Sequence, residues 1–215
     1  MSAPDLAWQP SLLDASAAPD VDRSFSSLSR IRLDPTSWVD HAPAWVSGSD
    51  RLFADLLAGT DWGQRTRRMY DHHVLEPRLT SWWSADSGRR LEPAILDRMR
   101  ALLSARYGVE LDSMGLNLYR DGRDSVAWHG DRIARAVAEP VVAIVSVGEP
   151  RKFLLRPKGG GRSTTFILGR GDLLVTGGAT QRAWQHTVPK VSTAGPRISI
   201  SYRHGLMPLA RPGPA

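Results

Sequence analysis

The second half of the chain is divided into six short apolar segments, each bounded by Gly, Pro or Asp. Runs of this length, rich in Val, Ile and Leu and broken by turn residues, predict β-strands. Such strands must pair into sheets that bury their apolar faces against one another. We therefore expect residues 109–205 to form a β-sandwich or jelly roll. The segments are SMGLNLYRD (113–121), PVVAIVSVG (140–148), RKFLLRP (151–157), STTFILG (163–169), GDLLVTGG (171–178) and RISISYRHG (197–205).

Two helical patterns precede these strands. Residues 47–59, SGSDRLFADLLAG, begin with Ser and Asp, carry Leu and Phe at helical spacing and end in Gly. Residues 91–108 carry a stripe of Ile, Leu and Met that ends at Gly, with Pro93 in the expected first turn. Residues 67–80, RRMYDHHVLEPRLT, predict one further strand. The whole pattern predicts an α+β protein with flanking N-terminal helices and a C-terminal half that is a β-sandwich or jelly roll.

The composition changes along the chain indicate its domain organisation. Residues 1–48 are rich in Pro, Ser, Asp and Ala without periodicity, so we expect an extension that is partly irregular. The helices lie in residues 49–108, the strands in 109–205, and a short tail in 206–215. At 215 residues, the chain is long enough for one domain, which we expect to span residues 49–205.

Composition also limits the chemistry. The chain has no cysteine, so disulfides, thiolate metal sites and cysteine nucleophiles are excluded. The formal net charge is +6, and of the 28 basic residues 3 are Lys and 25 are Arg. This charge favours a polyanionic partner, although a codon bias toward Arg would give the same excess. No apolar run approaches the ~18 residues of a membrane span, and no signal pattern opens the chain, so we expect a cytoplasmic protein without membrane contact.

A histidine and an aspartate stand two residues apart in DSVAWHGD, residues 124–131. In an extended segment such residues point to the same side, so His129 and Asp131 can reach one metal ion together. Two histidines and one carboxylate leave open positions on iron(II) for an oxygenase reaction, and His186 in RAWQHTVPK is the natural third ligand. A single H-x-D pair is weak support, because most such pairs are surface groups.

The last predicted strand, RISISYR, has two different faces. Arg197, Ser199, Ser201 and Arg203 share one face, and Ile198, Ile200 and Tyr202 share the other. The polar face could meet water, or its two Arg side chains could lean inward and grip a small dicarboxylate. Asn117 and Tyr119 share one face of GLNLYRD in the same way and would add an amide and a phenol.

Together these motifs resemble the AlkB family of iron(II)/2-oxoglutarate dioxygenases, which repair alkylated nucleic acid. The resemblance covers roughly residues 75–205 and rests on NLYRDGRDSVAWHGD, GGATQRAWQHTVPK and PRISISYR, which occur in the family's order. It implies a double-stranded β-helix (jelly-roll) core, in which iron(II) is held by His129, Asp131 and His186. It also implies that 2-oxoglutarate is held by Asn117, Tyr119, Arg197, Ser199 and Arg203. Ser199 stands where many members have Asn.

The resemblance also implies a reaction. With iron(II), 2-oxoglutarate and dioxygen, such an enzyme hydroxylates the N-methyl group of a base such as 1-methyladenine or 3-methylcytosine, releasing formaldehyde and succinate. The expected partner is DNA, either single-stranded or with the damaged base flipped out of its stack. The alternatives are the same chemistry on RNA or protein, or a catalytically silent nucleic-acid-binding module of this fold. We expect a monomer.

The stretch PRLTSWW resembles the family segment that packs against the target base. By this resemblance, the strands in residues 49–108 would recognise the nucleotide, and Arg78, Trp82 and Trp83 would lie near the substrate. Core packing is an equal alternative for whichever Trp does not stack on the base. Ile133 stands where many members have a carboxylate, so we expect weak discrimination between cationic and neutral adducts.

Overall fold

The computed structural model describes residue 6 and residues 17–69, 72–131 and 137–205. It contains three α-helices and one short 3-10 helix in these residues, and the rest of the regular structure is β-strand. The helices are α1 (Ser49–Gly59), α2 (Ile95–Tyr107), α3 (Thr180–Ala183) and the 3-10 helix η1 (Ala85–Ser87). None of the helices in the described ranges is long and apolar enough to cross a membrane.

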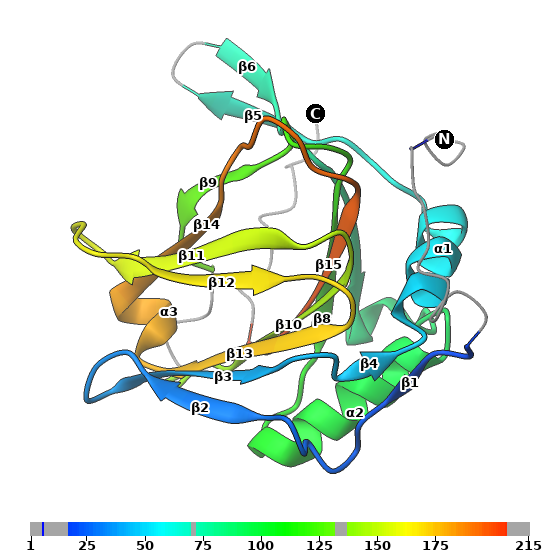
Figure 1. Ribbon diagram of the computed structural model, residues 1–215, viewed down its shortest axis with the longest axis horizontal. Coiled ribbons are helices and arrows are strands. Elements are labelled where there is room, and N and C mark those ends of the chain that lie inside the picture. The colour runs from blue at the N-terminus through cyan, green and yellow to red at the C-terminus, as the bar shows by residue number, and fades with distance from the viewer. Residues whose placement is uncertain (1–5, 7–16, 70–71, 132–136, 206–215) are drawn as a thin grey trace.

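The strands follow in chain order and all pair antiparallel (Figure 1). They are β1 (Asp20–Val21), β2 (Ser29–Arg32), β3 (Ser37–Ala42), β4 (Val46–Ser47), β5 (Thr66–Met69), β6 (His72–Leu75), β7 (Leu79–Ser84), β8 (Ser113–Tyr119), β9 (Val126–His129), β10 (Val142–Gly148), β11 (Arg151–Pro157), β12 (Thr164–Leu168), β13 (Asp172–Gly178), β14 (Trp184–Val188) and β15 (Arg197–Arg203).

Two sheets form the core of the molecule. The larger sheet has the order β2-β3-β13-β10-β15-β8-β7, and the smaller one has the order β12-β11-β14-β9. Between them lies an apolar cluster to which both sheets contribute, including Ile144 and Leu174 from the larger sheet and Phe153 and Phe166 from the smaller. This is the jelly-roll core that the sequence predicts, and the predicted α+β class is confirmed.

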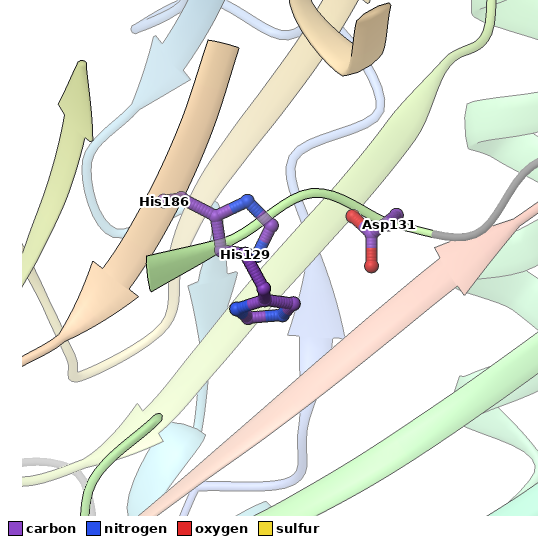
Figure 2. Close-up of side chains that lie close together, drawn as sticks. All are labelled: His129, Asp131 and His186. Carbon is purple, nitrogen blue, oxygen red and sulfur yellow. The ribbon is translucent and has the colours of Figure 1, made fainter. Parts of the chain in front are cut away.

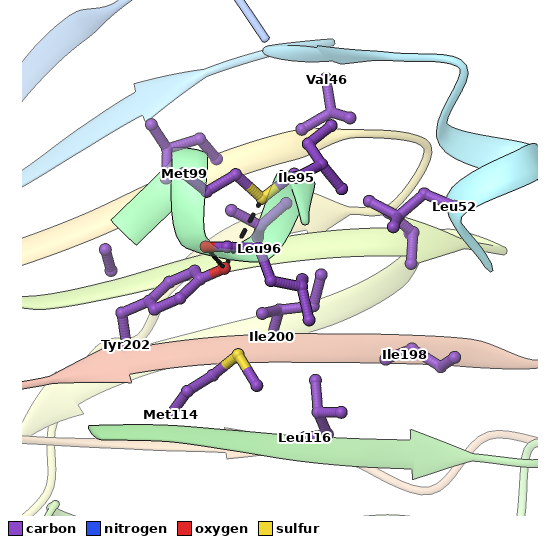
Figure 3. Packing of buried hydrophobic residues seen from close by; sticks show 14 of the residues in the cluster. Val46, Leu52, Ile95, Leu96, Met99, Met114, Leu116, Ile198, Ile200 and Tyr202 are labelled. Atoms are coloured by element: carbon purple, nitrogen blue, oxygen red, sulfur yellow. Dashed lines mark hydrogen bonds between the residues drawn. The ribbon is translucent and has the colours of Figure 1, made fainter. Parts of the chain in front are cut away.

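Helices α1 and α2 cover the outer face of the larger sheet. Alternation along β15 sends Ile198, Ile200 and Tyr202 to this face, where they pack with α1 and α2 (Figure 3). The Tyr202 hydroxyl donates a hydrogen bond to the Leu96 carbonyl oxygen of α2 at 2.9 Å. A strand with one apolar face packed on helices turns its other face toward the smaller sheet, and that face carries the polar residues.

Residues 20–47 differ from the expectation of a partly irregular extension. They contain four strands, and β3 pairs with β13 over six residue pairs inside the larger sheet. Val39 and Ala42 of β3 are fully buried. The sequence of β3, SWVDHA, is short and carries polar residues, so its alternation is hard to distinguish from that of a loop.

Three further features differ from the sequence prediction. Residues 67–80 are not one strand: β5 and β6 pair as a separate hairpin, and β7 begins after Pro77. Proline has no N–H for a sheet hydrogen bond, which explains the break. Eight strands follow Gly108 where six were expected, because β9 and β14 were missed. Pro93 precedes α2, which begins at Ile95, instead of lying in its first turn.

Candidate metal centre and co-substrate pocket

The two strands that sequence analysis missed each carry one histidine of the predicted metal site. β9 and β14 are neighbours at the edge of the smaller sheet, and His129 is the register partner of His186. The two imidazole ring centroids are 4.3 Å apart (Figure 2). His186 is buried, and burial lowers its pKa to about 4. Its ring is therefore neutral at pH 7 and keeps a nitrogen lone pair for a metal.

Asp131 completes the cluster. One ligand atom from each of His129, Asp131 and His186 lies within 4.8 Å of the other two, as expected for groups that can hold one ion. The Nδ1 atom of His129 lies 2.8 Å from the Ala127 carbonyl oxygen. A donated Nδ1–H at this position leaves Nε2 free to face a metal.

The two carboxylate oxygens of Asp131 have different surroundings. Oδ1 accepts a 3.0 Å hydrogen bond from Nε of Arg203 and lies 2.8 Å from Nη2 of the same residue in an ion pair. Oδ2 is buried and has no hydrogen-bond partner. Burial opposes ionisation of this carboxyl, but Arg203 and the two histidines overcome it and lower the pKa of Asp131 to about 2. An ionised, buried oxygen without a hydrogen-bond partner is suited to bind a metal ion. The donor set of two nitrogens and one oxygen fits iron(II).

A cavity of about 1140 Å³ opens between the two sheets beside these three residues. Its floor is the polar face of β7, β8 and β15, whose register places residues in rows across the sheet. Successive rows are Ser84, Ser113 and Arg203; Trp82, Gly115 and Ser201; Thr80, Asn117 and Ser199; and finally Tyr119 with Arg197. All these residues line the cavity. The structure thus brings the predicted metal and 2-oxoglutarate residues into one pocket.

Arg197 lies at the opposite end of the floor from Arg203. It is only 1% exposed, and its Nη2 donates a 2.6 Å hydrogen bond to the Ser146 hydroxyl. Its Nε and Nη1 are buried without hydrogen-bond partners. Burial lowers the pKa of Arg197 to about 10, so it remains charged at pH 7. A buried cation with two unused donors is a binding site for an anion.

The remaining predicted residues have distinct surroundings. Ser199 and Ser201 are buried with their hydroxyl oxygens 3.4 Å apart. Arg78 donates a 2.9 Å hydrogen bond from Nε to the Asn117 Oδ1 and pairs with Glu76 at 3.0 Å. Arg78 therefore lines the pocket as a support for Asn117, and it is not a free cation awaiting a phosphate. An Asn117 amide oxygen fixed in this way leaves the NH₂ group available to a ligand.

The neighbouring tryptophans Trp82 and Trp83 point to opposite faces of β7. Trp82 lines the pocket, and its ring lies across Gly115, where an added Cβ would stand 3.1 Å from a ring carbon. Trp83 packs against the core cluster under the helices, and its Nε1 donates a 2.7 Å hydrogen bond to the Arg89 carbonyl oxygen. The expectation that Trp83 contacts the substrate is corrected, because alternation along the strand turns it to the helix-covered face. Ile133 lies outside the described residues.

Three residues of the site were not found in the sequence. Gly115 shares a strand face with Asn117 and Tyr119, so extending the alternation by one step would have found it. Ser146 is a single hydroxyl in the apolar run VVAIVSVG, which is a weak signal. Arg151, discussed below, opens a strand beside a proline and resembles a solvent-exposed strand end.

Comparison with known proteins identifies the family of the chain. The model of the 2OG-Fe(II) oxygenase superfamily matches residues 83–203. The human protein named alpha-ketoglutarate-dependent dioxygenase alkB homolog 3 is 30% identical over 214 residues, covering 91% of this chain and 73% of the relative. The Arabidopsis thaliana protein named DNA oxidative demethylase ALKBH2 is 29% identical over 180 residues, covering 66% of this chain and 57% of the relative.

The fold has a counterpart among solved structures. The protein described in "The structure of OsALKBH1" superposes with a TM-score of 0.55 at 16% identity, covering 81% of this chain and 99% of the other. This likeness supports the jelly-roll fold, while the sequence relationships above establish the family. The chain therefore belongs to the 2OG-Fe(II) oxygenase superfamily and, within it, to the AlkB family of dioxygenases, whose reaction uses iron(II), 2-oxoglutarate and dioxygen.

Proposed function

We propose that this dioxygenase oxidatively demethylates alkylated bases in DNA, with 1-methyladenine and 3-methylcytosine as representative substrates. The observation that carries the proposal is one pocket with two sets of unused groups. At one end are two histidine rings and the partnerless Asp131 Oδ2, and at the other is the buried, partnerless side of Arg197. A metal and a dicarboxylate would satisfy both sets at once.

His129, Asp131 and His186 would hold the iron. The Arg203 guanidinium fixes the Asp131 carboxylate through Oδ1, which leaves Oδ2 directed to the metal. When bound, iron(II), 2-oxoglutarate and dioxygen supply the two-electron oxidation that hydroxylates the methyl carbon, and 2-oxoglutarate leaves as succinate and carbon dioxide. The hydroxymethylated nitrogen then loses formaldehyde, which restores the base.

Arg197 would take the far carboxylate of 2-oxoglutarate, with Asn117 and Tyr119 beside it on the same floor. Ser199 pairs with Asn117 on the same floor and would contribute a hydroxyl to the co-substrate site. Arg203 would also belong to the co-substrate site, because it pairs with Asp131 and so borders the metal end of the pocket. When 2-oxoglutarate binds, these polar groups would replace their hydrogen bonds to water by hydrogen bonds to its oxygens.

DNA is the proposed partner for four reasons. The net charge is +6, and Trp82 offers an aromatic face inside the pocket for a flipped base. Arg65 lies on the pocket lining and is exposed, so it can meet a phosphate. The similar Arabidopsis thaliana protein carries the name DNA oxidative demethylase. RNA is the second candidate substrate for the same chemistry. We propose that the protein acts as a monomer in the cytoplasm.

The test is base restoration measured by mass spectrometry. Oligonucleotides carrying 1-methyladenine or 3-methylcytosine, as DNA and as RNA, are incubated with protein, iron(II), 2-oxoglutarate and ascorbate. We expect restored base, formaldehyde and succinate in equal amounts, with DNA preferred. His186→Ala should abolish all three products, while Gln185→Ala, its neighbour on β14, should not. Restoration of RNA in preference to DNA would favour the second candidate, and succinate without restored base would refute the proposed substrate.

The range of lesions is a separate part of the proposal. With Ile133 where many family members carry a carboxylate, neutral etheno adducts should be accepted comparatively well beside cationic 3-methylcytosine. Ile133→Glu should favour the cationic lesion selectively. The expected change in preference is about 1–3 kcal/mol, the contribution of a partly desolvated hydrogen bond to a charged group. Rates on 3-methylcytosine and ethenoadenine in one oligonucleotide test this, and an equal response of both lesions would refute it.

A further inference from the structure

A second buried arginine lies behind the co-substrate pocket. Arg151 is the first residue of β11 and is 3% exposed. Its guanidinium carbon is 5.8 Å from the centroid of the Tyr119 ring, and that of Arg197 is 5.4 Å from the same centroid. Two cations therefore lie against one aromatic ring at the end of the pocket remote from the histidines. Cation–π attraction holds each guanidinium to the ring.

Arg151 has no carboxylate partner, and its bonds go to main-chain oxygens. Nη1 donates to the Asp121 carbonyl, and Nη2 donates to the carbonyls of Asp124 and Pro189, all at 2.9 Å. Its Nε is buried without a partner. These bonds place the guanidinium between the segment before β9 and the segment after β14, so its position is fixed by the backbone.

Two acidic side chains near Arg151, Asp121 and Asp124, are ion-paired with other arginines. The Asp124 carboxylate is bound by Arg120, at 2.8 Å from Nε and 2.9 Å from Nη2. The Asp121 carboxylate is bound by Arg123 at 2.7 Å from Nη2. Among the described residues, none of the ion pairs includes Arg151 or Arg197. The Tyr119 end of the pocket thus carries two cations that form no ion pair with a carboxylate of the described residues. The longer-range attraction of Asp121, Asp124 and Asp172 offsets the cost of burying these charges only in part.

We infer that Arg151 is a positioning residue that makes the pocket selective for a dicarboxylate. Arg197 would contact the far carboxylate of 2-oxoglutarate, and Arg151 would add its charge from behind Tyr119 without touching the ligand. Isolated buried charge is costly, so an anion that brings compensating charge to this end gains affinity from both cations. This inference rests on the proposed function, because it assumes that 2-oxoglutarate occupies this pocket.

The test compares two ligands that differ only at the far end. 2-Oxoglutarate and 2-oxopentanoate share the five-carbon chain and the 2-oxo acid group, but only the first has the second carboxylate. Binding to the iron(II)-loaded protein is measured without oxygen, by calorimetry and by the visible absorption of the iron–2-oxo acid complex. Arg151→Met keeps the apolar stem and removes the charge, and Arg151→Lys keeps the charge.

We expect Arg151→Met to weaken 2-oxoglutarate binding about 15- to 35-fold, the range given by the attraction between two unit charges roughly 8–10 Å apart at an effective dielectric constant of about 20. Binding of 2-oxopentanoate should change less than about twofold. Arg151→Lys should keep the preference for the dicarboxylate. The matched control is Arg123→Met. Arg123 lies between Asp121 and Asp124, whose carbonyls bind Arg151, but its own side chain is 89% exposed at the surface. Removal of its charge should leave both affinities unchanged.

Each other outcome has a definite meaning. Equal weakening of both ligands by Arg151→Met, or loss of the preference in Arg151→Lys, would show that the backbone contacts matter and the charge does not, which overturns the inference. Unchanged 2-oxoglutarate affinity in Arg151→Met overturns it as well. If the unaltered protein fails to bind 2-oxoglutarate, the proposed function fails instead. Should Arg151→Met not fold, the ligand preference of Arg151→Lys decides alone.

Discussion

Replacing Arg197 by methionine should make the protein more stable without its co-substrate and insensitive to that co-substrate. Burial lowers the pKa of Arg197 from 12.5 to about 10. One pKa unit corresponds to about 1.4 kcal/mol, so keeping this charge in the folded protein costs on the order of 3 kcal/mol. Because the folded-state pKa is the lower one, the cost is fully present at pH 7 and is relieved only as the pH rises above about 10.

Methionine removes that cost and also removes one hydrogen bond to Ser146 and the cation–π contact with Tyr119, which contribute about 1 kcal/mol each. The net gain for the ligand-free protein is then about 1 kcal/mol, or an increase of about 2–4 °C in Tm for a chain of this size. Replacement of a buried ion by an apolar group of similar size often has this sign. The unaltered protein should instead gain stability from 2-oxoglutarate, by an amount that grows with its concentration.

The assay is thermal unfolding with Mn²⁺ in place of iron, across a series of 2-oxoglutarate concentrations. Arg51→Met serves as control, because Arg51 is an exposed partner of Asp55 on α1, and it should change neither the Tm nor the response to 2-oxoglutarate. A destabilised Arg197→Met protein that still responds to 2-oxoglutarate would refute the reasoning, since Arg197 would then be a structural group and not the anion site.

Three further predictions concern the metal and the base. His186→Ala should lose tight Mn²⁺ binding in calorimetry while keeping its circular dichroism spectrum, because the apolar core forms apart from the metal; an unfolded variant would contradict this. Trp82→Ala should lose about 1–3 kcal/mol of single-stranded DNA binding with unchanged Tm, whereas Trp83→Ala should lower the Tm and spare binding; the reverse result would reassign the two rings. Gly115→Leu should displace the Trp82 ring and reduce base restoration, and adding Trp82→Ala should recover part of it; strictly additive losses would show that the two positions do not compete for space.

The sequence was informative wherever alternation was regular. Along β15, the pattern of Arg197 to Arg203 predicted which side chains face the pocket and which join the core, and the structure confirms both faces. The same rule predicted that Asn117 and Tyr119 share a face. Periodicity works here because one side of the sheet must be apolar to pack against helices.

Other features depend on partners that no local pattern reveals. β9 (VAWH) and β14 (WQHTV) are short and carry no clear alternation; β14 is held as a strand by pairing with β11, and β9 by pairing with β14. Trp82 and Trp83 are identical residues side by side, so their faces were known to differ, but which one met the pocket depended on the register with β8. The unpaired donors of Arg197 and the carbonyl contacts of Arg151 exist only once distant segments have assembled.

The pairing of β3 with β13 has a practical consequence for anyone who shortens this chain. A truncation at residue 49, which composition alone would suggest, removes β3 and leaves β13 as an open sheet edge along six residue pairs. Such an exposed row of amide and carbonyl groups, flanked by apolar side chains, invites edge-to-edge association between molecules. The shortened protein should therefore aggregate during expression even though every residue of the proposed catalytic pocket is still present.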